Sequence, residues 1–187
     1  MPAKSTNIYQ LKITLQDSKP PIWRRVQVQS SITLDVLHDI IQIAMGWTNS
    51  HLHHFRVGRR YYSHPDFDLE SSDDETRIKL NQILTTLKDK FFYEYDFGDG
   101  WDHQIVLEKI LPVEPEEQYP CCLTGKRCCP PEDVGGIWGY QSFLAALNDK
   151  KHPEHADALE QLEWIGDSFD PEEFDLAEVN EGLAELG

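Results

Sequence analysis

The sequence predicts an α+β fold, in which an antiparallel or mixed sheet is followed by a helical C-terminal third. Two segments, 9–28 and 91–110, alternate apolar and polar residues as the paired strands of a hairpin do. Residues 34–45 between them, and three stretches after residue 139, instead carry apolar residues at helical spacing. A hairpin, a helix and further strands also form the order of a β-grasp core, which is a fold-level analogy.

The first predicted element is a hairpin over residues 9–28. Its loop contains the sequence KPP at 19–21, which favours a connection wider than a two-residue turn. The apolar residues that place one face of this hairpin in the core are Tyr9, Leu11, Ile13, Leu15, Ile22, Val26 and Val28.

The next predicted element is a helix over residues 34–45. Thr33 is a suitable N-cap for it, and Gly46 stands where a helix usually ends. A short strand pair is expected after the helix, within residues 53–63. The run 65–75 is acidic and polar, so it predicts an exposed, mobile loop.

The second hairpin covers residues 91–110, and its turn is the sequence GDG at 98–100. The odd positions of both strands are aromatic or aliphatic, which predicts one buried face. Asp96 and Asp102 fall on the even, more solvated face. His103 falls among the aromatic residues.

The whole chain is expected to form a single domain over 1–187. Its parts are a β-rich region at 7–110, a Pro- and Cys-rich connection at 111–139 and a helical, acidic region at 140–187. Apolar spacing predicts helices around 140–147 and 159–165. Asp170 and Pro171 resemble the N-cap and first position of a third helix that continues to the end.

The charge of the chain is strongly negative and unevenly distributed. The formal net charge is −16 at pH 7, yet residues 1–62 hold eight Lys or Arg against three acids, and residues 153–187 hold twelve acids and no Lys or Arg. Binding of nucleic acid depends largely on neutralising phosphates, so it is disfavoured except through the basic first third. The arginines available there are Arg24, Arg25, Arg56, Arg59 and Arg60. Alternatively, the basic third balances the acidic third within the molecule.

Nothing in the sequence indicates export or a membrane. No apolar stretch approaches the roughly 20 residues that span a bilayer, and no charged-then-apolar leader follows Met1. We therefore expect a cytoplasmic protein, in which stable disulfides are not expected. The four cysteines of CCLTGKRCC are Cys121, Cys122, Cys128 and Cys129. Their adjacent pairs miss the C-x₂₋₄-C spacing of zinc sites, so a structural metal or an oxidation-dependent disulfide there is the less favoured alternative.

Histidines and aspartates near the two hairpins are candidate metal ligands. On a strand, His51 and His53 would point to the same face, and imidazoles can hold zinc or another divalent metal if further ligands arrive. Asp96, Asp99 and His103 are the nearest donors in the sequence. Such a site would suit a metal-dependent enzyme. The alternative is that these histidines are structural, because their spacing matches no established zinc motif.

A non-catalytic interaction domain is the favoured function, and whether the protein is an enzyme stays open. The chain contains no Gly-x-Ser-x-Gly motif, phosphate loop or dinucleotide motif. Tryptophans at loops or strand ends can anchor a peptide or protein partner, or they can close the core instead. The candidate partner-binding residues are Trp23, Arg24, Arg25, Trp47, Trp101 and Trp138.

Five segments together resemble the plasmid pRiA4b ORF-3-like family. They are YQLKITLQDSKPPIWRRVQV, LHDIIQIAMGWTNSHLHHFRVG, FFYEYDFGDGWDHQIVLEKI, CPPEDVGGIWGYQSFLAAL and FDPEEFDLAEVN, and they extend from Tyr9 to Asn180. The family pattern includes Trp23, Arg24, Arg25, Trp47, His51, His53, Trp101, His103 and Cys129 to Glu132. Cys121 and Cys128 lie outside that pattern, which weakens a four-thiolate zinc site.

The resemblance implies a compact α+β protein of bacteria or archaea, found on plasmids, chromosomes or mobile elements. It implies no particular activity. Some members carry labels that link them to insertion-element passengers or resolvases, which would imply a role on DNA. A serine resolvase needs a nucleophilic serine with an arginine cluster and a basic helix that reads DNA, and the acidic C-terminal third offers neither.

Overall fold

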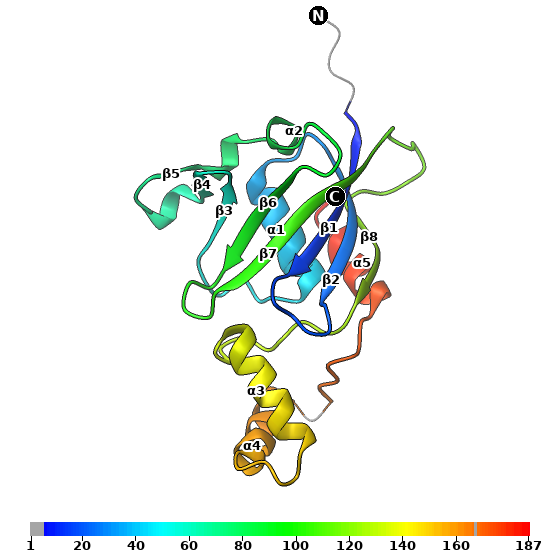
Figure 1. The fold of residues 1–187 in the computed structure, drawn as a ribbon. Helices are drawn as coiled ribbons and strands as arrows, with labels where there is room; N and C mark the ends of the chain where they lie inside the picture. Colours follow the sequence, from blue (N-terminus) through cyan, green and yellow to red (C-terminus); the bar gives the residue numbers. More distant parts are fainter. Residues whose placement is uncertain (1–5, 167) are drawn as a thin grey trace, which may run out of the picture.

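The structure is a computed structural model that describes residues 6–166 and 168–187. It confirms the predicted α+β class, because this part of the chain forms one eight-stranded sheet with five α-helices (Figure 1). The strands are β1 (Ile8–Leu15), β2 (Trp23–Gln29), β3 (His53–Val57), β4 (Arg60–Ser63), β5 (Ser72–Asp74), β6 (Lys90–Tyr95), β7 (Trp101–Leu111) and β8 (Cys121–Lys126). The helices are α1 (Leu34–Met45), α2 (Leu80–Ile83), α3 (Gly136–Asn148), α4 (His155–Ile165) and α5 (Leu176–Ala184), with 3₁₀-helices at Pro65–Phe67 and Glu75–Arg77.

The sheet is mixed, and its strand order is β5-β4-β3-β6-β7-β1-β2-β8. Every neighbouring pair is antiparallel except β4 with β5. Both predicted hairpins are present as β1–β2 and β6–β7, and the predicted strand pair is β3–β4. The two hairpins join in the middle of the sheet through an antiparallel β1–β7 pair.

The core lies between one face of the sheet and α1. The helix has its predicted bounds: Thr33 occupies the N-cap position without a side-chain cap hydrogen bond, and Gly46 ends the helix with a φ of 102°. Helix α5 lies beside α1 on the same face of the sheet (Figure 1). No described helix crosses the opposite face, whose side chains are partly exposed.

Residues 65–75 are more ordered than their polar sequence predicts. They contain the 3₁₀-helix Pro65–Phe67 and the strand β5, which pairs with β4. Glu75 at the end of the run is only 1% exposed. A contact with His53 in β3 compensates for this burial, because both carboxylate oxygens of Glu75 lie 3.0 Å from Nε2 of that histidine. The prediction of an exposed, mobile loop was therefore wrong at its buried end.

Two features after residue 111 also differ from the prediction. The Pro- and Cys-rich connection contains a strand, β8, which pairs with β2. The last helix begins at Leu176, and the Asp175 side chain before it accepts hydrogen bonds from the amides of Ala177 and Glu178. Asp170 accepts a hydrogen bond from the amide of Glu172, so it stabilises a turn and does not cap a helix.

The outer edge of β8 is closed by a side chain of α5. Asn180 Oδ1 accepts a hydrogen bond from the Cys122 amide at 2.7 Å, and Asn180 Nδ2 donates one to the Cys122 carbonyl at 2.9 Å. This one amide side chain therefore pairs with backbone groups that a neighbouring strand would otherwise bind.

Helix α3 begins against the turn of the β6–β7 hairpin. Gly136 has a φ of 70°, and a Cβ added to it would lie 2.2 Å from the carbonyl oxygen of Asp99. Gly139 is equally restricted, because a Cβ there would lie 2.0 Å from the carbonyl oxygen of Val134. Gly136 thus allows the start of α3 to approach the GDG turn through backbone contact, and Gly139 allows the loop before α3 to pack against the helix.

We expect the substitution Gly136→Ala to lower the free energy of unfolding by about 3 kcal/mol, because the added methyl meets a carbonyl oxygen that belongs to a fixed turn. Urea unfolding followed by circular dichroism measures the loss. Gly58→Ala is the matched control, since Gly58 has a φ of 60° and nothing lies within 4 Å of its added Cβ. The control should lose only about 1 kcal/mol for the left-handed backbone. Equal losses in the two variants would contradict a role for the contact with Asp99.

Candidate functional site

A groove of about 880 Å³ lies between the main body and the C-terminal helices. One wall is formed by the last turn of α1, Trp47 and the loop 128–134. The other wall is formed by the end of α4, the segment 169–175 and α5. The groove exists because α3 and α4 extend below the sheet before the chain returns to α5 (Figure 1).

The groove is both acidic and partly apolar. Its acidic lining residues are Glu132, Asp133, Glu173, Asp175 and Glu178. Arg24 is the one Lys or Arg among the described lining residues, and it is only 2% exposed. Trp164 of α4 also lines the groove and is 85% exposed, although an aromatic side chain of that size is usually covered. These features suit a ligand that is cationic and partly apolar.

The predicted tryptophan anchors fall into two groups. Trp47 and Trp101 are 6% and 0% exposed, and their rings lie 5.0 Å apart in the core. These two therefore pack the interior and cannot serve as exposed anchors. Trp23 is partly buried on the open face of the sheet, where the cations of Lys12 and Arg25 lie over its ring. Arg25 is itself one of the predicted partner-binding residues. Trp138 on α3 is 68% exposed and stays a candidate.

The predicted arginine pair is divided between the two faces of β2. Arg24 points into the core, where it donates hydrogen bonds to the carbonyls of Ala44, Trp23 and Lys126. Burial lowers its pKa. Arg25 points outward and forms a bidentate pair with Glu108 at 2.6 and 2.9 Å. Arg24 is thus a structural residue and is not available to a partner.

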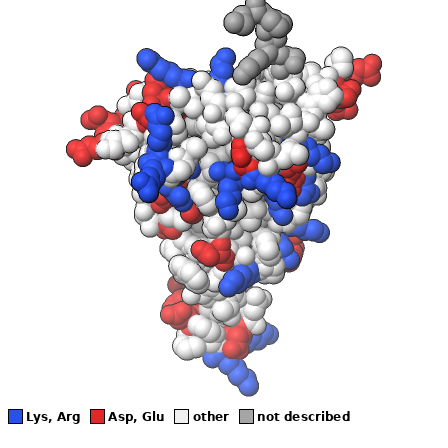
Figure 2. All heavy atoms as spheres, turned by 45° about the horizontal axis from the view of Figure 1, so that its top comes forward, with Lys and Arg blue, Asp and Glu red and all other residues white. Residues whose placement is uncertain are grey.

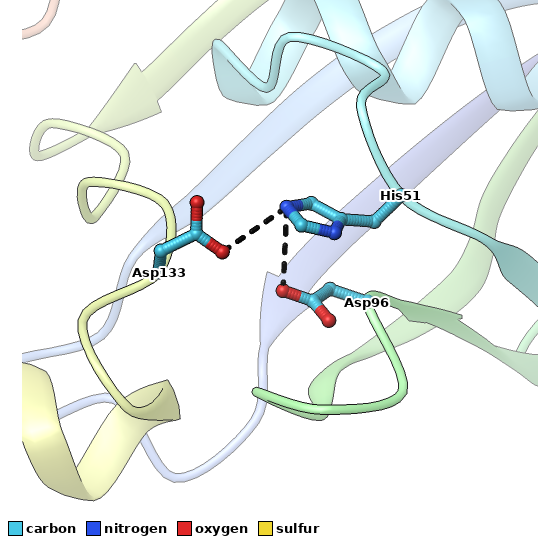
Figure 3. Close-up of side chains that lie close together, drawn as sticks. All are labelled: His51, Asp96 and Asp133. Carbon is cyan, nitrogen blue, oxygen red and sulfur yellow. Dashed lines mark ion pairs between the residues drawn. The ribbon is translucent and has the colours of Figure 1, made fainter.

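Three ionisable side chains converge at the mouth of the β6–β7 hairpin. His51 Nε2 lies 3.2 Å from Asp133 Oδ1 and 3.6 Å from Asp96 Oδ2, and Figure 3 shows all three pointing toward one another. Their ligand atoms all lie within 4.8 Å of one another. Two of the five predicted metal candidates, His51 and Asp96, therefore meet. Asp96 is 7% exposed, which corrects the prediction that it lies on the solvated face.

The other three metal candidates lie elsewhere. His53 is paired with Glu75 in the core, as described above. His103 is fully buried, and Trp47 Nε1 donates to its Nε2 while its Nδ1 lies 3.3 Å from the Tyr93 carbonyl. Asp99 lies in the hairpin turn, and its Oδ2 is buried without a hydrogen-bond partner among the described residues. His51 and His103 therefore do not meet at one metal site.

The buried histidines are held in the neutral form. Burial lowers the pKa of His103 to about 4. His38 and His53 stack with their ring centroids 3.5 Å apart, and burial lowers their pKa values to about 4 and about 3. Burial also raises the pKa of Glu75 to about 8, so the His53–Glu75 pair holds a single proton as a neutral pair.

Sequence reasoning missed several residues of this region, above all Asp133 and Glu132 in the loop before α3. Glu132 accepts hydrogen bonds from the Thr48 amide at 3.1 Å and from the Tyr95 hydroxyl at 2.7 Å. These bonds outweigh burial and lower the pKa of Glu132. They also fix the segment 48–51 that carries His51. The sequence motif PPED was visible, but its distance of about 80 residues from His51 gave no reason to join the two.

The four cysteines are free thiols in the structure. Burial raises the pKa of each thiol, most strongly for Cys129. Raised thiol pKa values oppose the thiolate form that metal binding and nucleophilic attack require. In the described part of the chain, the cluster with metal-binding geometry contains none of them.

Basic side chains gather on the open face of the sheet. Figure 2 shows Lys and Arg across the middle of the viewed surface, with acidic side chains among them. Arg25 is neutralised there by Glu108, and Arg60 at the sheet edge is paired with Asp73 at 2.7 Å. Arg56 lies over the ring of Phe92. Several of the arginines that could contact nucleic acid thus already have partners within the molecule.

Comparison with known proteins finds relatives that match nearly the whole length of the chain. The chain is 41% identical over 183 residues to "Uncharacterized protein y4hQ" of Sinorhizobium fredii, covering 96% of this chain and 92% of that protein. It is also similar to the crystal structure of the protein of unknown function MM3350 from Methanosarcina mazei Go1. That match has a TM-score of 0.81 and 38% identity, and it covers 92% of this chain and 97% of the other.

The described residues contain no helix long and apolar enough to cross a membrane. The model of the plasmid pRiA4b ORF-3-like protein family matches residues 7–178. This match agrees with the resemblance of the five sequence segments to the same family. The two similar proteins named above are described as uncharacterized and as of unknown function. The chain therefore belongs to the plasmid pRiA4b ORF-3-like family.

Proposed function

We propose that the protein is a non-catalytic interaction module that binds a basic, partly apolar segment of a partner protein in its groove. The observation that carries the proposal is the composition of the groove, which is lined by five acidic residues and by the exposed Trp164. A groove of about 880 Å³ is large enough for several side chains of a peptide. Exposed tryptophans are frequent energetic centres of interfaces.

The negative charge of the groove favours a partner segment that is positively charged. The acids of the groove come from three separate segments, the loop before α3, the segment before α5 and α5 itself. Lysine or arginine side chains of a partner would neutralise them, and Arg24 is too buried to compete. A leucine or aromatic side chain of the same segment would cover Trp164. An acidic partner or a nucleic acid would meet repulsion at this surface.

Fluorescence anisotropy with a labelled peptide tests the proposal. The probe is a peptide of about twelve residues in which arginine and leucine alternate, and its counterpart replaces each arginine with glutamate. We expect the arginine peptide to bind, the glutamate peptide not to bind, and affinity to fall as NaCl rises from about 0.05 to 0.3 M. Failure of the arginine peptide to bind at low salt would show that the proposed partner chemistry is wrong.

A pair of charge-reversed variants separates the groove from the general negative charge of the protein. The groove variant carries Glu173→Lys and Glu178→Lys, which reverse the charge of two residues that line the groove. The control variant carries Glu160→Lys and Glu163→Lys, which make the same change at two residues of α4 that do not line it. The groove variant should weaken binding at least about tenfold, or about 1.4 kcal/mol, and the control less than about twofold. Equal weakening would mean that the peptide binds the acidic surface without using the groove.

We further propose that the protein acts in the cytoplasm. The four free thiols support this location, because exported proteins usually oxidise paired cysteines to disulfides. Thiol counting on protein unfolded without reductant should give four free thiols for every chain. Two or fewer would contradict a reducing compartment.

A further inference from the structure

We propose that His51, Asp96 and Asp133 bind a divalent transition-metal ion such as zinc. The three side chains come from the loop after α1, the end of β6 and the loop before α3, so the fold brings together residues that are far apart in the sequence. The proposal concerns a site distinct from the peptide contacts of the groove and does not depend on them. Asp133 alone is shared, because it also lies at the rim of the groove.

The distances suit a small ion placed between the three ligands. Zinc binds nitrogen and oxygen ligands at about 2.0 to 2.2 Å, which sets neighbouring ligands of a tetrahedral site about 3.4 Å apart. The observed separations from His51 Nε2 are 3.2 Å to Asp133 and 3.6 Å to Asp96. The two carboxylates lie within 4.8 Å of each other. Asp133 can close that distance, because its side chain is 66% exposed on a loop.

The state of Asp96 indicates that the cluster is more than an ion pair. Its side chain is nine-tenths buried, and its Oδ1 accepts hydrogen bonds from the amides of Gly98 and Asp99. Its Oδ2 points at His51 from 3.6 Å, which is beyond hydrogen-bond reach, and no described residue donates to it. A carboxylate oxygen on a largely buried side chain, aimed at an imidazole without bonding to it, is in the position of a metal ligand.

The charge and donor types also favour a cation of intermediate hardness. One imidazole and two carboxylates carry a net negative charge whether or not the imidazole is protonated. Imidazole nitrogen suits zinc, copper, iron or nickel better than magnesium or calcium, which prefer oxygen ligands. Three protein ligands would leave at least one coordination position for water or for a ligand that arrives from the groove.

Zinc binding by untagged protein tests the inference. After equilibrium dialysis against zinc chloride, elemental analysis should find about one zinc for each chain. His51→Ala and Asp133→Asn should each weaken zinc binding at least about tenfold in a calorimetric titration. Asparagine is chosen at position 133 because the residue has a φ of 59°, which asparagine tolerates, and the exposed side chain is not needed for folding.

The control variant is His54→Ala. His54 Nε2 lies 3.1 Å from Glu94 Oε2, so it forms a histidine–carboxylate pair outside the cluster. This variant should bind zinc as the unaltered protein does. Zinc binding that is unaffected by His51→Ala and Asp133→Asn would overturn the assignment, because the ion would then lie at other residues. Less than about a tenth of an equivalent in the unaltered protein would overturn it as well.

Discussion

The free energy of unfolding should be greatest between about pH 6.5 and 7, should fall by roughly 2 kcal/mol between pH 6.5 and 5.5, and should fall by nearly 3 kcal/mol over the next pH unit. The cause is burial of His38, His53 and His103, whose pKa values are lowered to about 4, 3 and 4. Below pH 6.5 the unfolded chain binds three protons at these positions, and the folded chain binds none until about pH 4. Folding is therefore disfavoured throughout this range.

Glu75 acts in the opposite direction. Burial raises its pKa to about 8, so the folded chain retains a proton that the unfolded chain releases above about pH 4.5. The net difference grows from about half a proton at pH 6.5 to nearly two protons at pH 5.5 and below, which gives the stated losses. Above about pH 7 the histidines are neutral in both states, so only Glu75 contributes, and stability should decline by up to about 1.4 kcal/mol for each pH unit until about pH 8. Hydrogen bonds lower the pKa values of Asp89 and Glu108, which add to the loss only below about pH 4.5.

Urea unfolding at pH values between 5.5 and 7.5 measures this slope. In His38→Gln the slope below pH 6.5 should fall to about half, because one of the two net protons is removed. The same substitution at His54, a partly exposed histidine on the open face of the sheet, is the control for the chemical change itself. A stability that is constant between pH 6.5 and 5.5 would show that the buried imidazoles accept protons without unfolding.

Replacement of Arg24 by methionine should cost about 4 kcal/mol of folding free energy. The guanidinium donates to Ala44 O at 2.6 Å, to Trp23 O at 2.9 Å and to Lys126 O at 3.0 Å, and it lies over the ring of Phe174. Methionine preserves much of the apolar contact but leaves these three carbonyls without their donor. One of these carbonyls, that of Ala44, lies in the last turn of α1. A cation at this position also interacts favourably with the helix dipole.

The neighbouring substitution Arg25→Met is the control. Arg25 has the same chemistry on the same strand, but its pair with Glu108 is partly exposed, so its loss should cost about 1 kcal/mol or less. Thermal and urea unfolding of both variants give the comparison. If Arg24→Met were as stable as Arg25→Met, the buried carbonyls would have found water or other donors, and the ascribed structural role would be wrong.

Elements with strong local patterns could be predicted from the sequence. The helix between Thr33 and Gly46 and both hairpins are present as predicted. The spacing of apolar residues determines all three locally, and flanking residues mark the ends of the helix. Strand β8 was missed because its sequence, CCLTGK, has no alternation, and its pairing with β2 is a tertiary contact. Asp170 looked like a helix cap, but the helix follows Asp175, since similar Asx residues also stabilise turns.

The candidate site was only half predictable, for a similar reason. His51 and Asp96 attracted notice by residue type, but Asp133 joins them through folding alone. Arg24 could have been placed better, because it shares the even positions of β2 with the buried Val26 and Val28. A charged residue at an apolar position of a strand pattern indicates a buried structural charge. Glu75 gave no such signal, since it lies in a 3₁₀-helix and its partner His53 lies on β3, 22 residues earlier.

The pairing of Asn180 with Cys122 has a consequence for the behaviour of the protein at high concentration. Open backbone edges of sheets are templates on which further copies can add strands and aggregate. At β8 both groups of Cys122 are already bound by Asn180, and at the other end of the sheet β5 is only three residues long. Each end of the sheet therefore offers little for another copy to extend, which protects the protein against ordered aggregation through its strands.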